Sequence, residues 1–153
     1  MIIQTSFLGE IEIEESSIIN FPEGIPGFEQ SKRYVIIPMG EASPFFYLQS
    51  LDEKELCLLM GQPFVFFPNY EFDVPDEELQ KLEINDPVQE LAVYVIISVP
   101  EDFKLATANL LAPVVINTVN RKGMQYVPGK SIYSTRHYIF PNDSKNAQAG
   151  EVR

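Results

Sequence analysis

The chain has 153 residues, enough for one domain with a substantial core, and its 45% hydrophobic content is typical of a globular protein. Its formal net charge of −11 opposes direct binding to nucleic acid or to an anionic membrane and favours basic proteins as partners. A single cysteine, Cys57, and a single histidine, His137, exclude an internal disulfide and a Cys/His zinc site.

Short β-strands are predicted for most of the first half of the chain. Residues Glu10–Glu14 alternate acidic and apolar side chains, which is typical of a strand with one wet face and one buried face. Later runs are rich in β-branched or aromatic side chains and are bounded by Pro, Gly, Asn or Asp, as strands usually are. These runs are Ile18–Phe21, Tyr34–Ile37, Phe45–Leu48, Leu56–Met60 and Phe64–Phe67.

A short helix is predicted at Pro75–Leu82. Proline suits the first helical turn, where its missing N–H removes no hydrogen bond. Three acidic residues follow it, where the positive end of the helix dipole favours them. Glu77 and Lys81 lie four residues apart and therefore on one face of the helix.

The strands after this helix are predicted from two further patterns. Leu91–Val99 is apolar at nearly every position, which predicts a central strand covered on both faces. Val114–Val119 and Met124–Val127 flank Asn120–Gly123, which we interpret as a hairpin turn with a positive φ at Gly123.

The predicted fold is mainly β. Strands this short and this close leave no room for βαβ crossovers, so we expect an antiparallel meander that forms an incomplete barrel or sandwich. Residues 1–140 are expected to form a single β-rich domain. The polar residues 141–153 lack periodicity and are expected to be a flexible C-terminal tail.

Targeting signals are absent from the sequence pattern. The N-terminal residues lack the basic start and the apolar stretch of a signal peptide. The longest apolar run, Leu91–Val99, is about half the ~20 residues that a membrane-spanning helix needs. We therefore expect a soluble protein in the cytoplasm.

The negative charge is concentrated in one third of the sequence. Residues 41–90 hold twelve acidic against two basic residues, a net charge of −10. Residues 1–40 carry −4 and residues 91–153 carry +3. The acidic block predicts a surface that repels nucleic acid and attracts basic proteins.

Catalytic equipment is sparse by comparison. His137 is the single imidazole, no Gly-x-Ser-x-Gly elbow presents a serine, and a half-buried or surface histidine in a terminal strand is the simpler interpretation. Gly24–Gly27 lacks the Lys-Ser/Thr of a phosphate-binding loop. Carboxylates are numerous, so a small carboxylate-dependent hydrolase stays open as an alternative function.

A cation site is the remaining chemical possibility. Asp73, Asp76, Glu77 and Glu78 could bind a hard cation, but their spacing departs from that of a calcium loop. The preference of a helix N-terminus for acidic residues explains them without a metal. We expect no metal and no cofactor.

Three linear motifs are more informative than the search for catalytic residues. Phe21–Phe28 reads FPEGIPGF, Pro44–Ser50 reads PFFYLQS, and Asn109–Asn117 reads NLLAPVVIN. In order and spacing these strings resemble the FliW family of flagellar assembly factors. The resemblance runs from about Ile2 to Tyr138, and residues after Pro141 lie outside it.

This resemblance implies a non-enzymatic cytoplasmic regulator with a β-rich, barrel-like fold. Members of the family bind flagellin and CsrA, a small RNA-binding dimer that represses flagellin synthesis. While flagellin is scarce, the factor holds CsrA and translation proceeds. When flagellin accumulates it takes the factor, and the released CsrA stops translation.

The motif residues themselves are expected to build the scaffold. Apolar positions in or beside strands are expected to pack in the core; these are Phe21, Phe28, Leu110, Leu111 and Val114. Gly24, Gly27 and Pro113 are expected to shape turns.

Partner surfaces are therefore expected in the acidic block and among exposed aromatic residues. For CsrA we expect contact with Glu71, Asp73, Glu77 and Glu78, whose negative potential would also oppose RNA phosphates within the ~8 Å reach set by screening. For flagellin, whose terminal segments offer an apolar face, the candidates are Phe45, Phe46, Tyr47, Phe66, Phe67 and Tyr70. A structural flagellar subunit is a third possibility, although the acidic excess fits a soluble partner better than a polymerising one.

Overall fold

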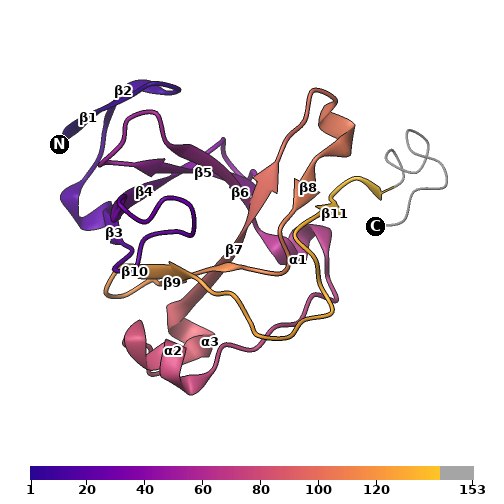
Figure 1. The fold of residues 1–153 in the computed structure, drawn as a ribbon. Helices are drawn as coiled ribbons and strands as arrows, with labels where there is room; N and C mark the ends of the chain where they lie inside the picture. Colours follow the sequence, from indigo (N-terminus) through magenta and orange to yellow (C-terminus); the bar gives the residue numbers. More distant parts are fainter. Residues whose placement is uncertain (142–153) are drawn as a thin grey trace.

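The structure is a computed structural model that describes residues 1–141. The predicted flexible tail over 141–153 therefore lies outside the described residues, apart from Pro141. Figure 1 shows a chain that is mostly strand with a few short helices. The strands are β1 Ile2–Thr5, β2 Gly9–Glu12, β3 Ile19–Asn20, β4 Arg33–Pro38, β5 Phe45–Ser50, β6 Cys57–Gly61, β7 Leu91–Ser98, β8 Thr107–Ala108, β9 Val114–Asn117, β10 Lys122–Gln125 and β11 His137–Tyr138. The helices are α1 Pro63–Phe66, α2 Asp76–Lys81 and α3 Pro87–Glu90, with 3-10 turns at η1 Glu15–Ser17 and η2 Phe103–Leu105.

Seven of these strands close into a barrel. Their order around the ring is β7, β6, β5, β4, β3, β10 and β9, and β9 pairs again with β7. Neighbours are antiparallel except for β3 and β10, which pair in parallel at Asn20 and Lys122. The prediction of a mainly β, barrel-type fold is confirmed, and the ring is closed.

Strand β7 occupies the central position predicted for it. One edge of β7 pairs with β6, and the other edge pairs with β9 beside Leu91–Tyr94 and with β8 beside Ile97 and Ser98. Strands β8 and β11 therefore extend outward from the barrel wall (Figure 1). Most β7 side chains are half-buried, and Val95 and Ile97 are fully buried.

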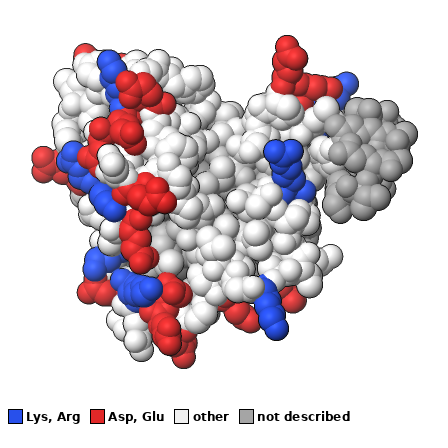
Figure 2. Space-filling view, viewed as in Figure 1, with Lys and Arg blue, Asp and Glu red and all other residues white. Residues whose placement is uncertain are grey.

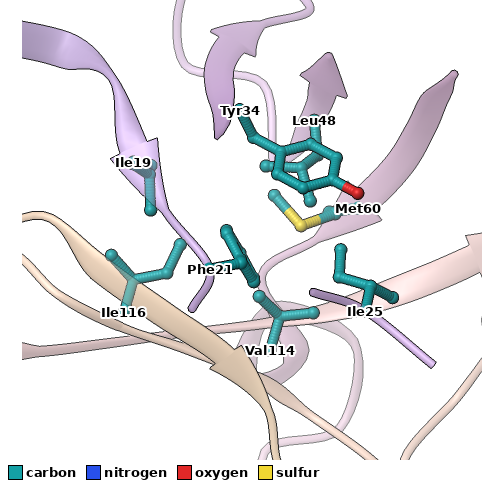
Figure 3. Packing of buried hydrophobic residues seen from close by; sticks show 8 residues of the cluster. All are labelled: Ile19, Phe21, Ile25, Tyr34, Leu48, Met60, Val114 and Ile116. Atoms are coloured by element: carbon teal, nitrogen blue, oxygen red, sulfur yellow. The ribbon is translucent and has the colours of Figure 1, made fainter. Parts of the chain in front are cut away.

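The barrel interior holds the main hydrophobic core. Figure 3 shows Phe21 between side chains of opposite walls, with its ring 5.0 Å from that of Tyr34 in an edge-to-face arrangement. The aromatic ring also explains Gly123 in β10, because a Cβ there would lie 2.8 Å from Phe21 Cζ. The fully buried members of this core are Ile19, Phe21, Ile25, Tyr34, Leu48, Met60, Val114 and Ile116.

Two predicted local features are wrong. Residues Phe64–Phe67 are not a strand: Pro63 starts helix α1, and the Phe67 amide donates to the Pro63 carbonyl over 2.8 Å. Gly123 does not adopt a positive φ, because it pairs with Ile116 in the sheet. Arg121, with φ of 60°, makes the reversal between β9 and β10 instead.

The Phe21–Phe28 motif forms a tight connection after β3, as expected. Gly24 has φ of +69°, and a Cβ on it would lie 2.6 Å from Glu29 Cα, so only glycine fits. Gly27 has φ of +92°. The expected core position of Phe28 is wrong, because the side chain is 41% exposed at the end of this turn.

Helix α2 confirms the helix predicted at Pro75–Leu82. Pro75 occupies the N-cap, and the first turn carries Asp76, Glu77 and Glu78. Leu82 and Ile84 are buried below it against Val115 of β9, in a small cluster of their own. This cluster holds the acidic helix against the outside of the barrel.

Candidate functional site

A groove of about 810 Å³ lies between two irregular segments of the chain. One wall comes from residues 70–75 and the other from residues 126–133, which run beside each other below β11 and α1 in Figure 1. Leu110, Leu111 and Pro113 lie between the walls. Five aromatic residues line the groove: Phe64, Tyr70, Phe72, Tyr126 and Tyr133.

Tyr70 anchors the floor of the groove. Its side chain is 5% exposed, and its hydroxyl donates to the Leu110 carbonyl over 2.7 Å. Burial raises the pKa of the Tyr70 phenol far above its ordinary value, and the neighbouring Tyr133 raises this pKa further by a smaller amount. The hydroxyl therefore stays protonated and keeps this hydrogen bond at any physiological pH.

Tyr133 ties the two walls together. Its ring packs edge-to-face on Tyr70 at 4.8 Å, and its hydroxyl accepts the Glu71 amide over 2.9 Å. The turn that follows is fixed by His137, whose Nε2 accepts the Ser134 amide over 2.9 Å. The single histidine is thus half-buried in a terminal strand, as predicted, and its ring orders the groove wall.

The Asn109–Asn117 motif forms the floor and pins the second wall at both ends. The Leu111 amide donates to the Ser134 carbonyl over 3.1 Å, and the Tyr126 amide donates to the Pro113 carbonyl over 2.9 Å. Leu110 and Val114 are buried, as expected for core residues. Leu111 is half-buried and lines the groove, which the sequence reasoning did not anticipate.

The four acidic residues predicted to contact a basic partner lie on two neighbouring elements. Glu71 and Asp73 line the groove, whereas Glu77 and Glu78 belong to α2. Glu71, Asp73 and Glu77 are exposed and form no ion pair within residues 1–141. Glu78 is partly buried and pairs with Lys81 over 3.4 Å.

Other acidic residues of the 41–90 block stabilise the fold instead of forming a free surface. Asp52 accepts the Lys32 and Arg33 amides and pairs with the Arg33 side chain over 2.9 Å. Partial burial acts to raise the pKa of Asp52, but these hydrogen bonds outweigh it and hold the pKa below its ordinary value. Glu53 accepts the Ser31 hydroxyl over 2.7 Å, and Glu90 accepts the Asp86 amide over 2.8 Å.

Charge is also unevenly distributed over the visible surface. Figure 2 shows acidic and basic side chains gathered along the side that carries the β1–β2 hairpin, β3 and α2. The middle of the same face is almost free of charged side chains. Within residues 1–141, Asp52, Glu78 and Glu83 of the predicted acidic block form ion pairs, whereas Glu71, Asp73 and Glu77 form none.

The six aromatic residues proposed for flagellin do not share one surface. Phe45 and Phe66 pack on each other at 5.3 Å and continue through Phe103 and Phe140. Phe103 is 50% exposed, so this ring of four phenylalanines reaches solvent. The other four lie elsewhere: Phe46 against Tyr94, Tyr47 against the exposed Phe7, Phe67 against His137, and Tyr70 in the groove floor.

Within residues 1–141 no three His, Cys, Asp or Glu side chains come together as a metal site. Over the same range, every helix is too short to span a bilayer.

The second wall of the groove was missed by the sequence reasoning. Residues 126–133 read YVPGKSIY, which mixes aromatic, proline and glycine residues without strand or helix periodicity. The opposing segment 70–75 has a similar mixture, YEFDVP. The two irregular segments that contain aromatic residues were the only sequence indication of this groove. No local pattern indicates that the two segments meet.

Comparisons with known proteins agree with this fold and with the motifs. The family model described as FliW protein matches residues 2–139. The flagellar assembly factor FliW of Syntrophomonas wolfei is 49% identical over 98% of this chain and 96% of that protein. The Bacillus subtilis factor is 43% identical over 91% and 96% of the two chains. A crystal structure of a flagellar assembly factor FliW superimposes with a TM-score of 0.86 at 40% identity, covering 92% of this chain and 98% of the other. The chain therefore belongs to the FliW family of flagellar assembly factors.

Proposed function

We propose that this flagellar assembly factor acts in the cytoplasm as a non-enzymatic regulator that binds flagellin and the translational regulator CsrA in exchange for one another. Binding of CsrA would relieve repression of flagellin translation, and accumulating flagellin would displace it. The observation that carries the proposal is a group of exposed carboxylates in the 71–78 segment, those of Glu71, Asp73 and Glu77, which form no ion pair with the described residues. An RNA-binding partner has the basic surface that these carboxylates would attract.

The position of these carboxylates supports two effects on the partner. Long-range attraction would accelerate encounter between the two proteins, because the whole chain carries −11. After docking, the same charges would oppose RNA phosphates that approach within about 8 Å at physiological salt. No direct contact between this protein and nucleic acid is required.

For flagellin, the exposed end of the Phe45–Phe66–Phe103–Phe140 ring gives an apolar surface beside β5 and α1. This surface and the carboxylates of the 71–78 segment are formed by different elements. Two separate surfaces would allow either simultaneous binding or displacement through the intervening structure. We expect flagellin to bind the aromatic surface.

The test is a mixing experiment on purified proteins. Flagellin and CsrA are added separately and together, and the complexes are resolved by size-exclusion chromatography with light scattering. We expect a complex with each partner and loss of the CsrA complex as flagellin is added. If neither partner binds, the proposal is wrong.

A charge-neutralised variant sharpens the test. Glu71→Gln, Asp73→Asn and Glu77→Gln together should weaken CsrA binding about tenfold at low salt and reduce its salt dependence. The matched control is Glu12→Gln, Glu41→Gln and Glu101→Gln, which removes the same charge from exposed positions elsewhere. Equal affinities of the two variants would contradict a role for the 71–78 segment.

The hydrolase alternative gains no comparable support. Glu71 and Asp73 are the two carboxylates that line the groove, and both are exposed on the same wall. The opposite wall contributes Lys130 and no carboxylate. Catalysis would need two carboxylates that face each other across a bound substrate. Two carboxylates on the same wall favour binding of a cationic group instead.

A further inference from the structure

We infer that the groove between residues 70–75 and 126–133 binds an extended peptide segment of a partner protein, one with apolar side chains and a lysine or arginine. The inference goes beyond the proposed function, because it concerns the kind of segment recognised and not the identity of the protein that carries it. It is based on the backbone of the two walls, on their lining and on their charge.

The backbone of both walls is available for hydrogen bonding. The amides of Phe72 and Asp73 on one wall, and of Lys130 and Ile132 on the other, make no hydrogen bond with any described part of the chain. Neither wall is a strand or a helix. An extended peptide between them can pair its main chain with these groups, as in strand addition to an exposed edge.

The lining selects apolar side chains. Five aromatic rings and three prolines line the groove. Aromatic-lined grooves are surfaces that recognise extended, proline-containing segments. Two large apolar side chains of the lining are exposed: Ile132 is 92% exposed and Phe64 is 49% exposed. Burial of these side chains by a ligand would be favourable.

The charge across the groove sets the preference for a basic residue. Glu71 and Asp73 lie on one wall without an ion pair inside the described range, and Lys130 lies on the other. A lysine or arginine of the ligand can therefore approach the first wall, and an acidic residue there would be repelled.

Hydrogen bonds within the chain join the walls and the floor of the groove. The Tyr133 hydroxyl accepts the Glu71 amide from the opposite wall, and the Tyr70 hydroxyl donates to the Leu110 carbonyl in the floor. A groove that is formed before binding loses less conformational freedom when a ligand binds, which favours useful affinity from a short segment.

The experiment begins with the full-length protein and a displayed library of random decapeptides. Enriched peptides are synthesised with a fluorescent label, and their dissociation constants are measured by anisotropy. We expect enrichment of apolar and proline residues together with lysine or arginine. A library that yields no binding peptide would overturn the inference.

Two matched pairs of variants locate the binding site. Ile132→Asp should raise the dissociation constant at least tenfold, whereas Val88→Asp, on α3 and also 92% exposed, should leave it unchanged. The double variant Glu71→Gln, Asp73→Asn should raise the dissociation constant about fivefold at low salt. The control variant Glu41→Gln, Glu101→Gln should leave the dissociation constant unchanged. Both Asp variants alter exposed side chains, and equal melting temperatures confirm that folding is intact.

The remaining outcomes are also decisive. Peptides that bind Ile132→Asp as tightly as the unaltered protein would place their site elsewhere and overturn the inference. A dimer in light scattering that Ile132→Asp dissociates would assign the groove to a second copy of the chain, also against it. Failure of flagellin and CsrA to bind in the mixing experiment leaves the peptide measurements unaffected, so the two proposals can fail separately.

Discussion

Asp52 is an acidic residue whose charge serves the fold. It receives two backbone amides and the guanidinium of Arg33, so it fixes the β5–β6 turn against the start of β4. Its depressed pKa means that the folded state favours the ionised form. The contribution is therefore complete above the ordinary carboxyl pKa of about 4 and is lost as pH falls through the lowered value.

The variant Asp52→Asn should test this contribution. At pH 7 we expect a loss of about 1 kcal/mol in the free energy of unfolding, since charged hydrogen bonds become neutral ones. The difference from the unaltered protein should shrink as pH falls through the lowered pKa of Asp52, because the carboxyl group then becomes protonated in the folded state as well. Urea denaturation at a series of pH values measures it. Glu41→Gln alters an exposed side chain that forms no ion pair with residues 1–141, so it should show no difference at pH 7. A pH-independent loss for Asp52→Asn would contradict the role of ionisation.

Single residues also show where the sequence was insufficient. Tyr70, one of the candidates for contact with flagellin, is buried among other aromatic rings, and its hydroxyl donates to the Leu110 carbonyl. That acceptor lies 40 residues away in the chain, so no local pattern reveals it. Phe28 shows the opposite error, because its motif suggested a core residue and the turn after Gly27 leaves it exposed.

A buried amide side chain adds to the apolar packing that attaches helix α2 to the barrel. Asn117, at the end of β9, is 1% exposed and donates to the Leu82 and Glu83 carbonyls at the end of the helix. Its Oδ1 accepts the amides of Val119 and Asn120 in the following turn. One side chain thus fixes both the β9–β10 hairpin and the acidic helix.

Replacement of this residue should be costly. We expect Asn117→Ala to lower the free energy of unfolding by about 2–3 kcal/mol, because buried carbonyl groups lose their donor. Asn120→Ala is the matched control: Asn120 shares the Leu82 acceptor but is exposed, so we expect a loss below about 1 kcal/mol. Chemical denaturation of the two variants measures the difference. Equal losses would mean that burial of Asn117 contributes nothing.

Elements were predicted best where the pattern was long. The runs that became β4, β5, β6 and β7 had enough β-branched or aromatic residues to define strands, and the acidic first turn defined α2. Strands β8 and β11 have two residues each and carry no periodic signal. Phe64–Phe67 has the composition of a strand, but Pro63 directly after β6 starts a helical turn there.

At the scale of the whole molecule, the fold class followed from sequence but the closure of the ring did not. Closure depends on β9 meeting β7 and on β10 meeting β3, and the second contact joins distant parts of the chain, Asn20 and Lys122. The candidate groove has the same origin, because its walls are more than fifty residues apart. Local patterns define elements, whereas non-local pairing places them.

The net charge of −11 also acts on the whole molecule. Mutual repulsion of the carboxylates disfavours the compact state, and salt screens it. Three ion pairs lie within residues 1–141, and each includes an exposed side chain. Such pairs contribute little to stability, so screening them by salt costs little. The melting temperature should therefore rise by about 2–4 °C between 0.02 and 0.5 M sodium chloride, corresponding to about 1 kcal/mol.

Differential scanning calorimetry across that salt range measures the effect. The variant with Glu71→Gln, Asp73→Asn and Glu77→Gln has three fewer negative charges, so its melting temperature should rise less with salt. A melting temperature that falls as salt is added would show that attraction between charges outweighs repulsion.

The parallel contact between β3 and β10 has a consequence for synthesis of the protein. The Asn20 amide donates to the Arg121 carbonyl over 2.8 Å, so the barrel closes through residues separated by about two thirds of the chain. On the ribosome, strands β3 to β6 emerge long before β10, and β3 keeps an unpaired edge throughout that time. We expect the native barrel to form only after β10 has emerged from the ribosome, so newly made molecules become able to bind partners only after that point.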